Sequence, residues 1–181
     1  DGSGDVVNAE NTFSLASVND KPELVGTKAT FIAGREDTPY TISANQLFAG
    51  YDDVDGDEIS IENLSATNGS LEDLGNGNWR FTPDLNFNGI VTLSYELSDN
   101  QESTAVTNTF TLAADNDFPV LPTNVTPLDN GTEDIAYTVK ASDLLDGVID
   151  VDNDPLSVTN LSVTRGSLSA GSNGEWTYTP E

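Results

Sequence analysis

The sequence predicts an all-β protein made of tandem antiparallel β-sandwiches of the Greek-key type, each with about seven strands. Short runs rich in Thr, Val, Ile, Phe and Tyr are separated by Asn, Gly, Asp and Pro, a pattern typical of strands joined by tight turns. The chain also repeats itself with a period of 97 residues. Glu36–Asp84 aligns to Glu133–Glu181 without a gap, with 24 identities in 49 positions. A fixed period of this kind indicates an array of small domains.

The repeat also predicts the domain boundaries. Residues 1–24 match the last strand and linker of one unit, 25–118 form one whole unit, and 119–181 match the first part of a following unit. We therefore expect the chain to be a window on a longer array. The last segment lacks counterparts of Asn86–Leu112, so we expect its sandwich to be incomplete.

The elements of the whole unit follow from local patterns. The expected strands are Thr30–Ala33, Tyr40–Ser43, Glu58–Ser65, Gly69–Leu74, Trp79–Thr82, Ile90–Leu97 and Ala105–Ala114. Ser43–Ala49 predicts a one-turn helix with Ser43 as its N-cap, and Ala141–Leu145 repeats it. Gly75–Asn78 is a hairpin turn signal. Alternating apolar residues such as Val91 and Leu93 predict sheets with one buried face.

The composition excludes several classes of partner. Thirty-one acidic residues against six basic ones give a net charge of −25, so we expect no binding to nucleic acid or to anionic lipid. The chain has neither Cys nor His, which excludes disulfides, thiol chemistry and thiolate or imidazole metal sites. No apolar run is long enough to insert into a membrane. A salt-adapted acidic surface is one reading of the charge, but the acids recur at the same few positions.

The densest acidic cluster is Asp53, Asp55 and Asp57, at spacing i, i+2, i+4. The second copy carries the same triplet as Asp150, Asp152 and Asp154. In an extended chain the three side chains would share one side, roughly 6–7 Å apart, and each pair would repel by about 2–3 kcal/mol. Oxygen-only ligands favour a hard cation, and we expect Ca²⁺. The alternative is an ordinary turn rich in Asp.

The cluster is not an EF-hand loop. Counting from Asp53, position six is Glu58 and position twelve is Leu64, where that loop needs Gly and Glu. The remaining ligands must therefore come from elsewhere in the fold. The candidates are Glu36 and Glu133, the pairs Asn19–Asp20 and Asn116–Asp117, and Asp99. An Asn-Asp pair before Pro is also an ordinary linker sequence.

Four motifs in fixed order carry a resemblance to a known family. They are Glu36-Asp-Thr-Pro, Asp53-Val-Asp-Gly-Asp, Leu97-Ser-Asp-Asn and Asn116-Asp-x-Pro. Together they resemble a cadherin-type repeat, and they are most similar to the bacterial cadherin-like repeats of large secreted or surface-attached adhesins. The resemblance implies a cadherin- or immunoglobulin-like sandwich, an extracellular place on the bacterial surface, and Ca²⁺ at the joints between repeats.

The resemblance also implies which residues meet at each joint. One joint would be formed by Glu36, Asp115, Asn116, Asp117, Asp150 and Asp152. The other would be formed by Asn19, Asp20, Asp53, Asp55 and Asp99. The linkers lack the full Asp-x-Asn-Asp-Asn string of animal cadherins, so we expect fewer ions at each joint.

These observations favour a calcium-rigidified extender whose partners are the adjacent repeats of the same chain. The alternative is a module that binds polysaccharide or a like copy of itself, with Trp79 and Trp176 as sugar platforms. Both Trp residues share strand parity with core aromatics, which favours packing. We expect no enzyme, because catalysis without His or Cys would fall to carboxylate pairs or a metal-bound water, and no Lys or Tyr partner repeats beside the acids.

Overall fold

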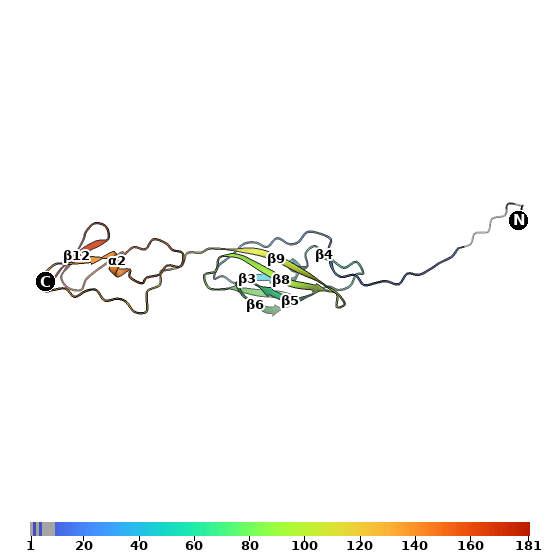
Figure 1. The fold of residues 1–181 in the computed structure, drawn as a ribbon, viewed down its shortest axis with the longest axis horizontal. Coiled ribbons are helices and arrows are strands. Elements are labelled where there is room, and N and C mark those ends of the chain that lie inside the picture. Colours follow the sequence, from blue (N-terminus) through green and yellow to red (C-terminus); the bar gives the residue numbers. More distant parts are fainter. Residues whose placement is uncertain (1, 3, 5–9) are drawn as a thin grey trace. The chain divides into compact units, whose positions relative to one another are not determined.

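The computed structural model describes residues 2, 4 and 10–181 and divides into two compact units, Asp1–Ala114 (unit 1) and Asp115–Glu181 (unit 2). In both units strands contribute more residues than helices (Figure 1). The all-β prediction is therefore confirmed. Neither helix in the described part of the chain is long and apolar enough to cross a membrane.

Unit 1 contains two sheets and a short ribbon. The first sheet has the order β2 (Gly34–Arg35), β9 (Ser103–Ala113), β8 (Gly89–Ser98), β5 (Ser60–Ala66). The second has the order β3 (Tyr40–Ser43), β7 (Asn78–Pro83), β6 (Gly69–Gly75). The ribbon joins β1 (Glu23–Leu24) to β4 (Tyr51–Asp52). Every pair is antiparallel except β2 with β9.

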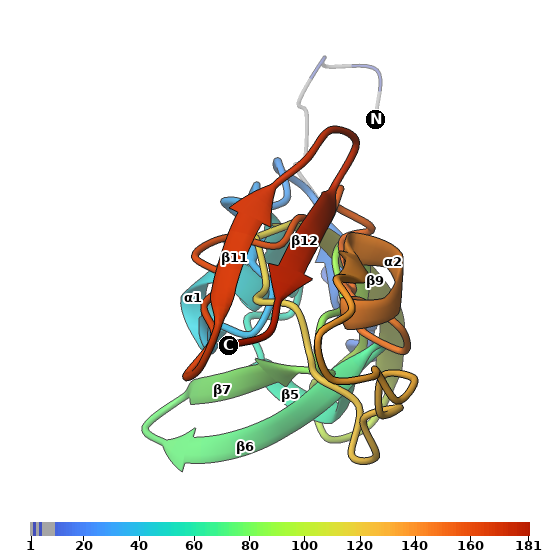
Figure 2. The ribbon, with the colours of Figure 1, turned by 90° about the vertical axis from the view of Figure 1, so that its left-hand side faces the viewer.

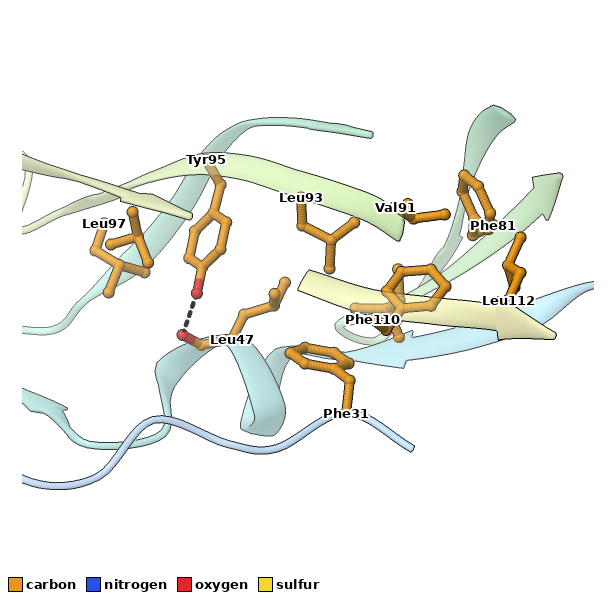
Figure 3. Packing of buried hydrophobic residues seen from close by; sticks show 11 residues of the cluster. Phe31, Leu47, Phe81, Val91, Leu93, Tyr95, Leu97, Phe110 and Leu112 are labelled. Atoms are coloured by element: carbon orange, nitrogen blue, oxygen red, sulfur yellow. Dashed lines mark hydrogen bonds between the residues drawn. The ribbon is translucent and has the colours of Figure 1, made fainter. Parts of the chain in front are cut away.

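The inner faces of the two sheets enclose one apolar core (Figure 3). On β8 the predicted alternation is present, since Val91, Leu93, Tyr95 and Leu97 are buried while Ser94 between them is exposed. From the opposite sheet, Ile42 and Phe81 are also buried in this core. Burial of this many apolar side chains is the main source of folding free energy for a domain of this size.

Aromatic rings fill one end of this core. The Phe110 ring stacks on Tyr40 with a centroid distance of 4.5 Å and meets the edge of Phe81 at 5.5 Å. Towards the other end, the buried Tyr95 hydroxyl donates to the Leu47 carbonyl over 2.8 Å and accepts from the Asn108 amide over 2.9 Å, and Figure 3 shows the first of these bonds. The polar atoms buried here are therefore satisfied.

The predicted helix and hairpin are both present. Helix α1 (Ala44–Phe48) begins after Ser43, whose N–H and hydroxyl both donate to the Gln46 side-chain oxygen over 3.0 Å. The β6–β7 turn places Asn76 and Gly77 at φ of 52° and 69°. Positive φ at both central residues defines a type I′ turn, which Asn-Gly adopts at low cost.

The strand expected at Thr30–Ala33 lies later in the chain. Thr30–Ala33 is not a strand; β2 covers Gly34–Arg35 instead and pairs in parallel with the end of β9. The Ile32 carbonyl accepts a hydrogen bond from the Tyr40 hydroxyl at 2.9 Å, so it is held by a side chain. Phe31 still packs in the core. The alternating pattern of Thr30–Ala33 therefore predicted the burial of Phe31 correctly, but it did not predict which residues pair with a neighbouring strand.

Unit 2 contains a single sheet with the order β10 (Tyr137–Lys140), β12 (Glu175–Thr179), β11 (Ser167–Ala170). Helix α2 (Ala141–Leu144) follows β10 directly, as α1 follows β3. Figure 2 shows β11 and β12 side by side, as their antiparallel pairing requires. This sheet copies β3–β7–β6 of unit 1. The described residues of unit 2 form this one sheet.

Candidate metal-binding clusters

The loop after β4 is a tight turn, so the expectation of an extended run over Asp53–Asp57 was wrong. The Asp53 carboxylate oxygen Oδ1 accepts the backbone N–H groups of Asp55 and Asp57 over 2.9 and 3.3 Å. Gly56 takes φ of +80° and its N–H donates to the Asp53 carbonyl. An Asp side chain that accepts from backbone N–H groups further along the chain closes such a turn. The three carboxylates therefore do not lie in a row.

Asp55 binds the linker that precedes β1. Its Oδ2 accepts the Asp20 backbone N–H over 2.8 Å, and its Oδ1 accepts the Ser17 hydroxyl over 3.2 Å. These residues are 35 and 38 positions apart from Asp55 in the sequence. The carboxylate thus fixes the linker to the loop after β4.

Asp99 holds the same linker from the β8–β9 turn. Its Oδ2 accepts the Asn19 side-chain amide over 2.9 Å, and Asn19 in turn accepts from the Gln101 amide over 2.6 Å. Its Oδ1 accepts the backbone N–H groups of Gln101 and Glu102, each over 2.6 Å. The hydrogen bond from the Glu102 N–H, followed by that from Asn19, lowers the pKa of the Asp99 carboxyl below its usual value.

These contacts bring five predicted residues together, which we call cluster 1. Cluster 1 consists of Asn19, Asp20, Asp53, Asp55 and Asp99. The structure places them at the linker end of unit 1, as the resemblance implied, although it does so through hydrogen bonds between protein groups.

Unit 2 repeats this geometry 97 residues later. Asp150 Oδ1 accepts the N–H groups of Asp152 and Asp154 over 3.0 and 3.1 Å, and Asp152 Oδ2 accepts the Asp117 N–H over 2.7 Å. Asn153, at φ of +62°, takes the place of Gly56. We call Asn116, Asp117, Asp150 and Asp152 cluster 2. The two copies agree in both partners and distances, so the arrangement is a property of the repeat.

One buried side-chain oxygen of cluster 1 has no hydrogen-bond partner. Asp53 is only 5% exposed, and its Oδ2 is buried without a hydrogen-bond partner. A buried acceptor left without a partner costs about 1–3 kcal/mol, and a charged one costs more. A native fold that keeps such an oxygen needs something to satisfy it.

The carboxylates of the described residues do not themselves form a closed cage. Across residues 2, 4 and 10–181, no three Asp or Glu side chains gather closely enough to hold a metal ion as they stand. Asp57 and Asp154 are exposed, and their backbone N–H groups, rather than their carboxylates, take part in the turns. Donors for a hard cation are nevertheless present, because all the side-chain groups of cluster 1 carry oxygen.

Glu36 lies at the opposite end of unit 1 from cluster 1. Its N–H donates to the Ala113 carbonyl at the end of β9, whereas Asp99 lies just before the start of that strand. Glu36 is 2% exposed and accepts the Asn88 side-chain amide over 3.1 Å. Its copy in unit 2, Glu133, is exposed.

Asp115 and Asn116 are both exposed, and the Asn116 amide donates to the Asp117 carbonyl over 3.0 Å.

Sequence reasoning missed three residues that hold the acids in place: Ser17, Asn88 and Gln101. All three have short polar or amide side chains without a repeated motif around them, so only the fold could reveal their contacts.

Both Trp residues are half-buried, and Trp79 packs against the core of unit 1. Core packing, which the sequence favoured over a sugar platform, is therefore what the structure shows for Trp79. Asp37, at φ of 54°, accepts the Asn86 backbone N–H over 2.9 Å and so caps a loop.

Comparison with known proteins identifies a family. The sequence profile of a family described as the cadherin-like domain matches residues 18–113 and 115–181. The two matched segments coincide closely with units 1 and 2. A search of curated proteins gave no match.

Solved structures with some likeness to the chain include two fucoidan-degrading enzymes. One is the endo-fucoidan hydrolase MfFcnA4 from glycoside hydrolase family 107, at 17% identity and a TM-score of 0.41, covering 88% of this chain and 24% of the enzyme. The other is the endo-fucoidan hydrolase MfFcnA9 of the same family, at 16% identity and 0.39, covering 90% and 30%. The chain thus spans less than a third of each enzyme, and their hydrolase activity is not carried over to it.

Proposed function

Because the chain belongs to the family of cadherin-like domains, we propose that it is a calcium-binding structural segment in which Ca²⁺ ties each linker to the sandwich that follows it. Cluster 1 would hold the ion through the carboxylates of Asp53, Asp55 and Asp99 and the side-chain oxygen of Asn19. Cluster 2 would use Asp117, Asp150 and Asp152. A bound Ca²⁺ would supply positive charge among carboxylates that otherwise repel one another.

The observation that carries the proposal is the buried Asp53 Oδ2. The oxygen is removed from water and accepts no hydrogen bond, while the other oxygen of the same carboxylate accepts two backbone N–H groups. The fold therefore pins this carboxylate in place and leaves one oxygen for a ligand other than protein. A divalent cation matches the negative charge, the oxygen donors and the absence of His and Cys.

Calcium binding would compete with hydrogen bonds that are present now. Asp55 accepts from Ser17 and Asp20, and Asp99 accepts from Asn19. These bonds hold the linker near the loop even before an ion arrives, so less conformational entropy is lost on binding. The linker is thus pre-organised for the ion that would lock it.

The wider role we propose is that of an extender repeat of a large extracellular bacterial adhesin. Ion binding at each linker would stiffen the joints between adjacent repeats and hold a distal binding domain away from the cell. Extracellular modules bind Ca²⁺ with dissociation constants of about 0.1–1 mM, so the calcium outside the cell would decide the stiffness. Glu36 is a buried acid at the opposite end of unit 1 from cluster 1, and it is the ligand we add for the far joint.

We infer a structural role and no catalytic one. The acids of both clusters accept backbone N–H groups within turns and linkers. Such contacts fix the course of the chain. A general acid or base instead needs a carboxyl group that lies within hydrogen-bond reach of a substrate proton.

The test compares thermal unfolding and heats of binding in EDTA and in millimolar CaCl₂. A ligand that binds only the folded chain stabilises it by about 1.4 kcal/mol at ten times its dissociation constant. We therefore expect a higher melting temperature in calcium and a measurable heat of Ca²⁺ uptake. Asp53→Asn keeps the shape of the side chain and removes its charge, so most of the calcium-induced stabilisation of unit 1 should be lost.

Asp84→Asn is the matched control. Asp84 is an exposed carboxylate on the loop before β8, remote in sequence from both linkers, so removing its charge tests for a general effect of net charge. The variant should respond to calcium like the wild type. An equal calcium response in Asp53→Asn and the wild type would rule out the site.

A further inference from the structure

The side-chain amide of Asn19 is the one neutral side chain of cluster 1, and both of its ends are hydrogen-bonded. Its Nδ2 donates to Asp99 Oδ2 over 2.9 Å, and its Oδ1 accepts from Gln101 Nε2 over 2.6 Å. Gln101 is held in turn, because its backbone N–H donates to Asp99 Oδ1 over 2.6 Å. The three residues therefore form a closed ring of hydrogen bonds between the linker and the β8–β9 turn.

This ring fixes which way the Asn19 amide points. A reversed amide would set its oxygen against the Asp99 carboxylate, so that two acceptors would face each other. It would also set its NH2 group against the NH2 group of Gln101, so that two donors would face each other. Asp99 is buried, and a buried charged acceptor that loses its donor costs free energy. The orientation in the structure is therefore the stable one as long as Asn19 has only these two partners.

The same orientation conflicts with the binding of a cation. The proposed site uses the Asn19 oxygen together with the Asp99 carboxylate, and a cation accepts oxygen ligands but repels N–H groups. The oxygen that Gln101 now occupies therefore has to be released, and the Asn19 NH2 group has to turn away from Asp99. The Gln101 amide can follow this turn because it carries both an oxygen and an NH2 group. After both amides have turned, the Asn19 NH2 group would donate to Gln101 Oε1.

We propose that Gln101 is a positioning residue that sets the calcium affinity of cluster 1, by holding the Asn19 oxygen until an ion reverses both amides. This inference rests on the proposed calcium site and adds a residue that contacts no ion. An amide suits the role because it donates in one orientation and accepts in the other, whereas a carboxylate only accepts and an ammonium group only donates. The hydrogen bond between the two amides is thus kept in both orientations, in opposite senses.

The first measurement is hydrogen exchange of the Gln101 side-chain NH2 group in the full chain, labelled with ¹⁵N, in EDTA and in saturating CaCl₂. A ligand that stabilises a fold normally slows exchange near its site. Here we expect the opposite at this one group, because its NH2 loses the Asn19 oxygen. Its exchange should become about threefold to tenfold faster, as for the loss of one neutral hydrogen bond. The backbone N–H groups of Gln101 and Glu102 donate to Asp99 in any case and should not become faster.

The second measurement is calorimetric titration with CaCl₂, in a chain whose cluster 2 is removed by Asp150→Ala and Asp152→Ala. Gln101→Glu cannot donate to the Asn19 oxygen, so that oxygen is available from the start. Asn100→Asp is the matched control, since it adds the same charge to the same turn at an exposed residue with φ of 75°, which Asp tolerates. We expect Gln101→Glu to bind calcium about threefold to tenfold more tightly than Asn100→Asp. Gln101→Met loses the bond in both orientations and should stay within about twofold of the chain with Gln101.

A double-mutant cycle with Asn19→Asp isolates the turning amide. A carboxylate at position 19 offers an oxygen in either orientation, so Gln101→Glu should gain nothing over Asn100→Asp in that background. Faster exchange of the Gln101 NH2 group in calcium, with a gain in affinity that needs Asn19, supports the proposal. Unchanged or slower exchange while calcium is bound, or equal affinities of Gln101→Glu and Asn100→Asp, overturns it and leaves the calcium site in place. Absence of any heat of calcium uptake overturns both this proposal and the site.

Discussion

The aspartates of cluster 1 direct most of their accepting capacity to backbone N–H groups. Asp53, Asp55 and Asp99 between them accept five such groups, from the turn that each closes and from the linker. Bonds of this kind lie in the range of about 1.5–3 kcal/mol for a charged acceptor. These hydrogen bonds of the acids fix the linker end of unit 1 without any bound ion. Of the carboxylate oxygens of Asp53, Asp55 and Asp99, only Asp53 Oδ2 takes no part in them.

The lowered pKa of Asp99 makes a prediction about pH. The unfolded chain takes up the proton near the usual Asp value of about 3.9, whereas the folded chain takes it up only at lower pH. The contribution of Asp99 to the free energy of unfolding is therefore present above about pH 4 and is lost as the pH falls through the folded-state pKa. In Asp99→Asn this part of the acid dependence should disappear.

The measurement is urea unfolding in EDTA between about pH 3 and pH 7. The wild type should exceed Asp99→Asn in stability at neutral pH, and the difference should shrink in acid. Asp84→Asn serves again as the control, with a difference from the wild type that changes little over the range. A gap between wild type and Asp99→Asn that stays constant down to pH 3 would show that the hydrogen bonds do not favour the ionised form.

Single residues show how far the sequence alone could reach. The family resemblance grouped Asn19, Asp53, Asp55 and Asp99 at one joint, and hydrogen bonds place these residues around the linker that precedes β1. It could not show that Asp53 is buried or that its loop is a turn, since both depend on β4 and on the linker. Ser17 was not found at all, because one Ser hydroxyl in a polar linker carries no pattern.

Among the elements, the pattern Gly-Ser-Leu on β6 and again on β11 has a steric cause. A Cβ on Gly69 would lie 2.4 Å from the Thr82 carbonyl oxygen and 2.5 Å from the Phe81 ring. A Cβ on its copy Gly166, directly before β11, would lie 2.4 Å from the Thr179 carbonyl oxygen. The Phe81 ring on the neighbouring strand covers Gly69, an arrangement found where a side chain packs closely over the backbone of a strand.

Gly69→Ala should therefore destabilise unit 1 by about 1–3 kcal/mol, the usual cost of forcing extra atoms into a packed site. Chemical unfolding followed by Trp79 fluorescence measures the change. Ser70→Ala, at the next and exposed position of the same strand, should cost much less. Equal effects of the two substitutions would mean that Phe81 and the Thr82 backbone move aside easily.

The sequence predicted the elements whose position depends on neighbouring residues. It did not predict those whose position depends on pairing with a strand far away in the sequence. The Asn76–Gly77 turn, α1 and the long strands β8 and β9 appear where the sequence placed them. The strand expected at Thr30–Ala33 lies at Gly34–Arg35 because the end of β9 sets its position, since β pairing is a property of two segments.

At the scale of the whole molecule, two units of one family differ in completeness. Unit 1 has a core of two sheets that draws on β3, β5, β7, β8 and β9. Unit 2 has one sheet, and Val139, at 8% exposure, is its only buried apolar residue among those that the structure describes. Less apolar area removed from water means less folding free energy, so unit 2 should unfold at a lower temperature than unit 1.

The two Trp residues allow the units to be followed separately, because Trp79 lies in unit 1 and Trp176 in unit 2. We predict that Asp150→Ala combined with Asp152→Ala abolishes the calcium response of unit 2 and leaves the unfolding of unit 1 unchanged. The reason is that the core and cluster 1 of unit 1 draw on residues 19–112 alone. Trp176→Phe and Trp79→Phe backgrounds report each unit in turn, in EDTA and in calcium.

Small-angle scattering of the same samples should show that the double variant no longer becomes stiffer in calcium. Loss of stability in unit 1 would contradict the independence of the two clusters.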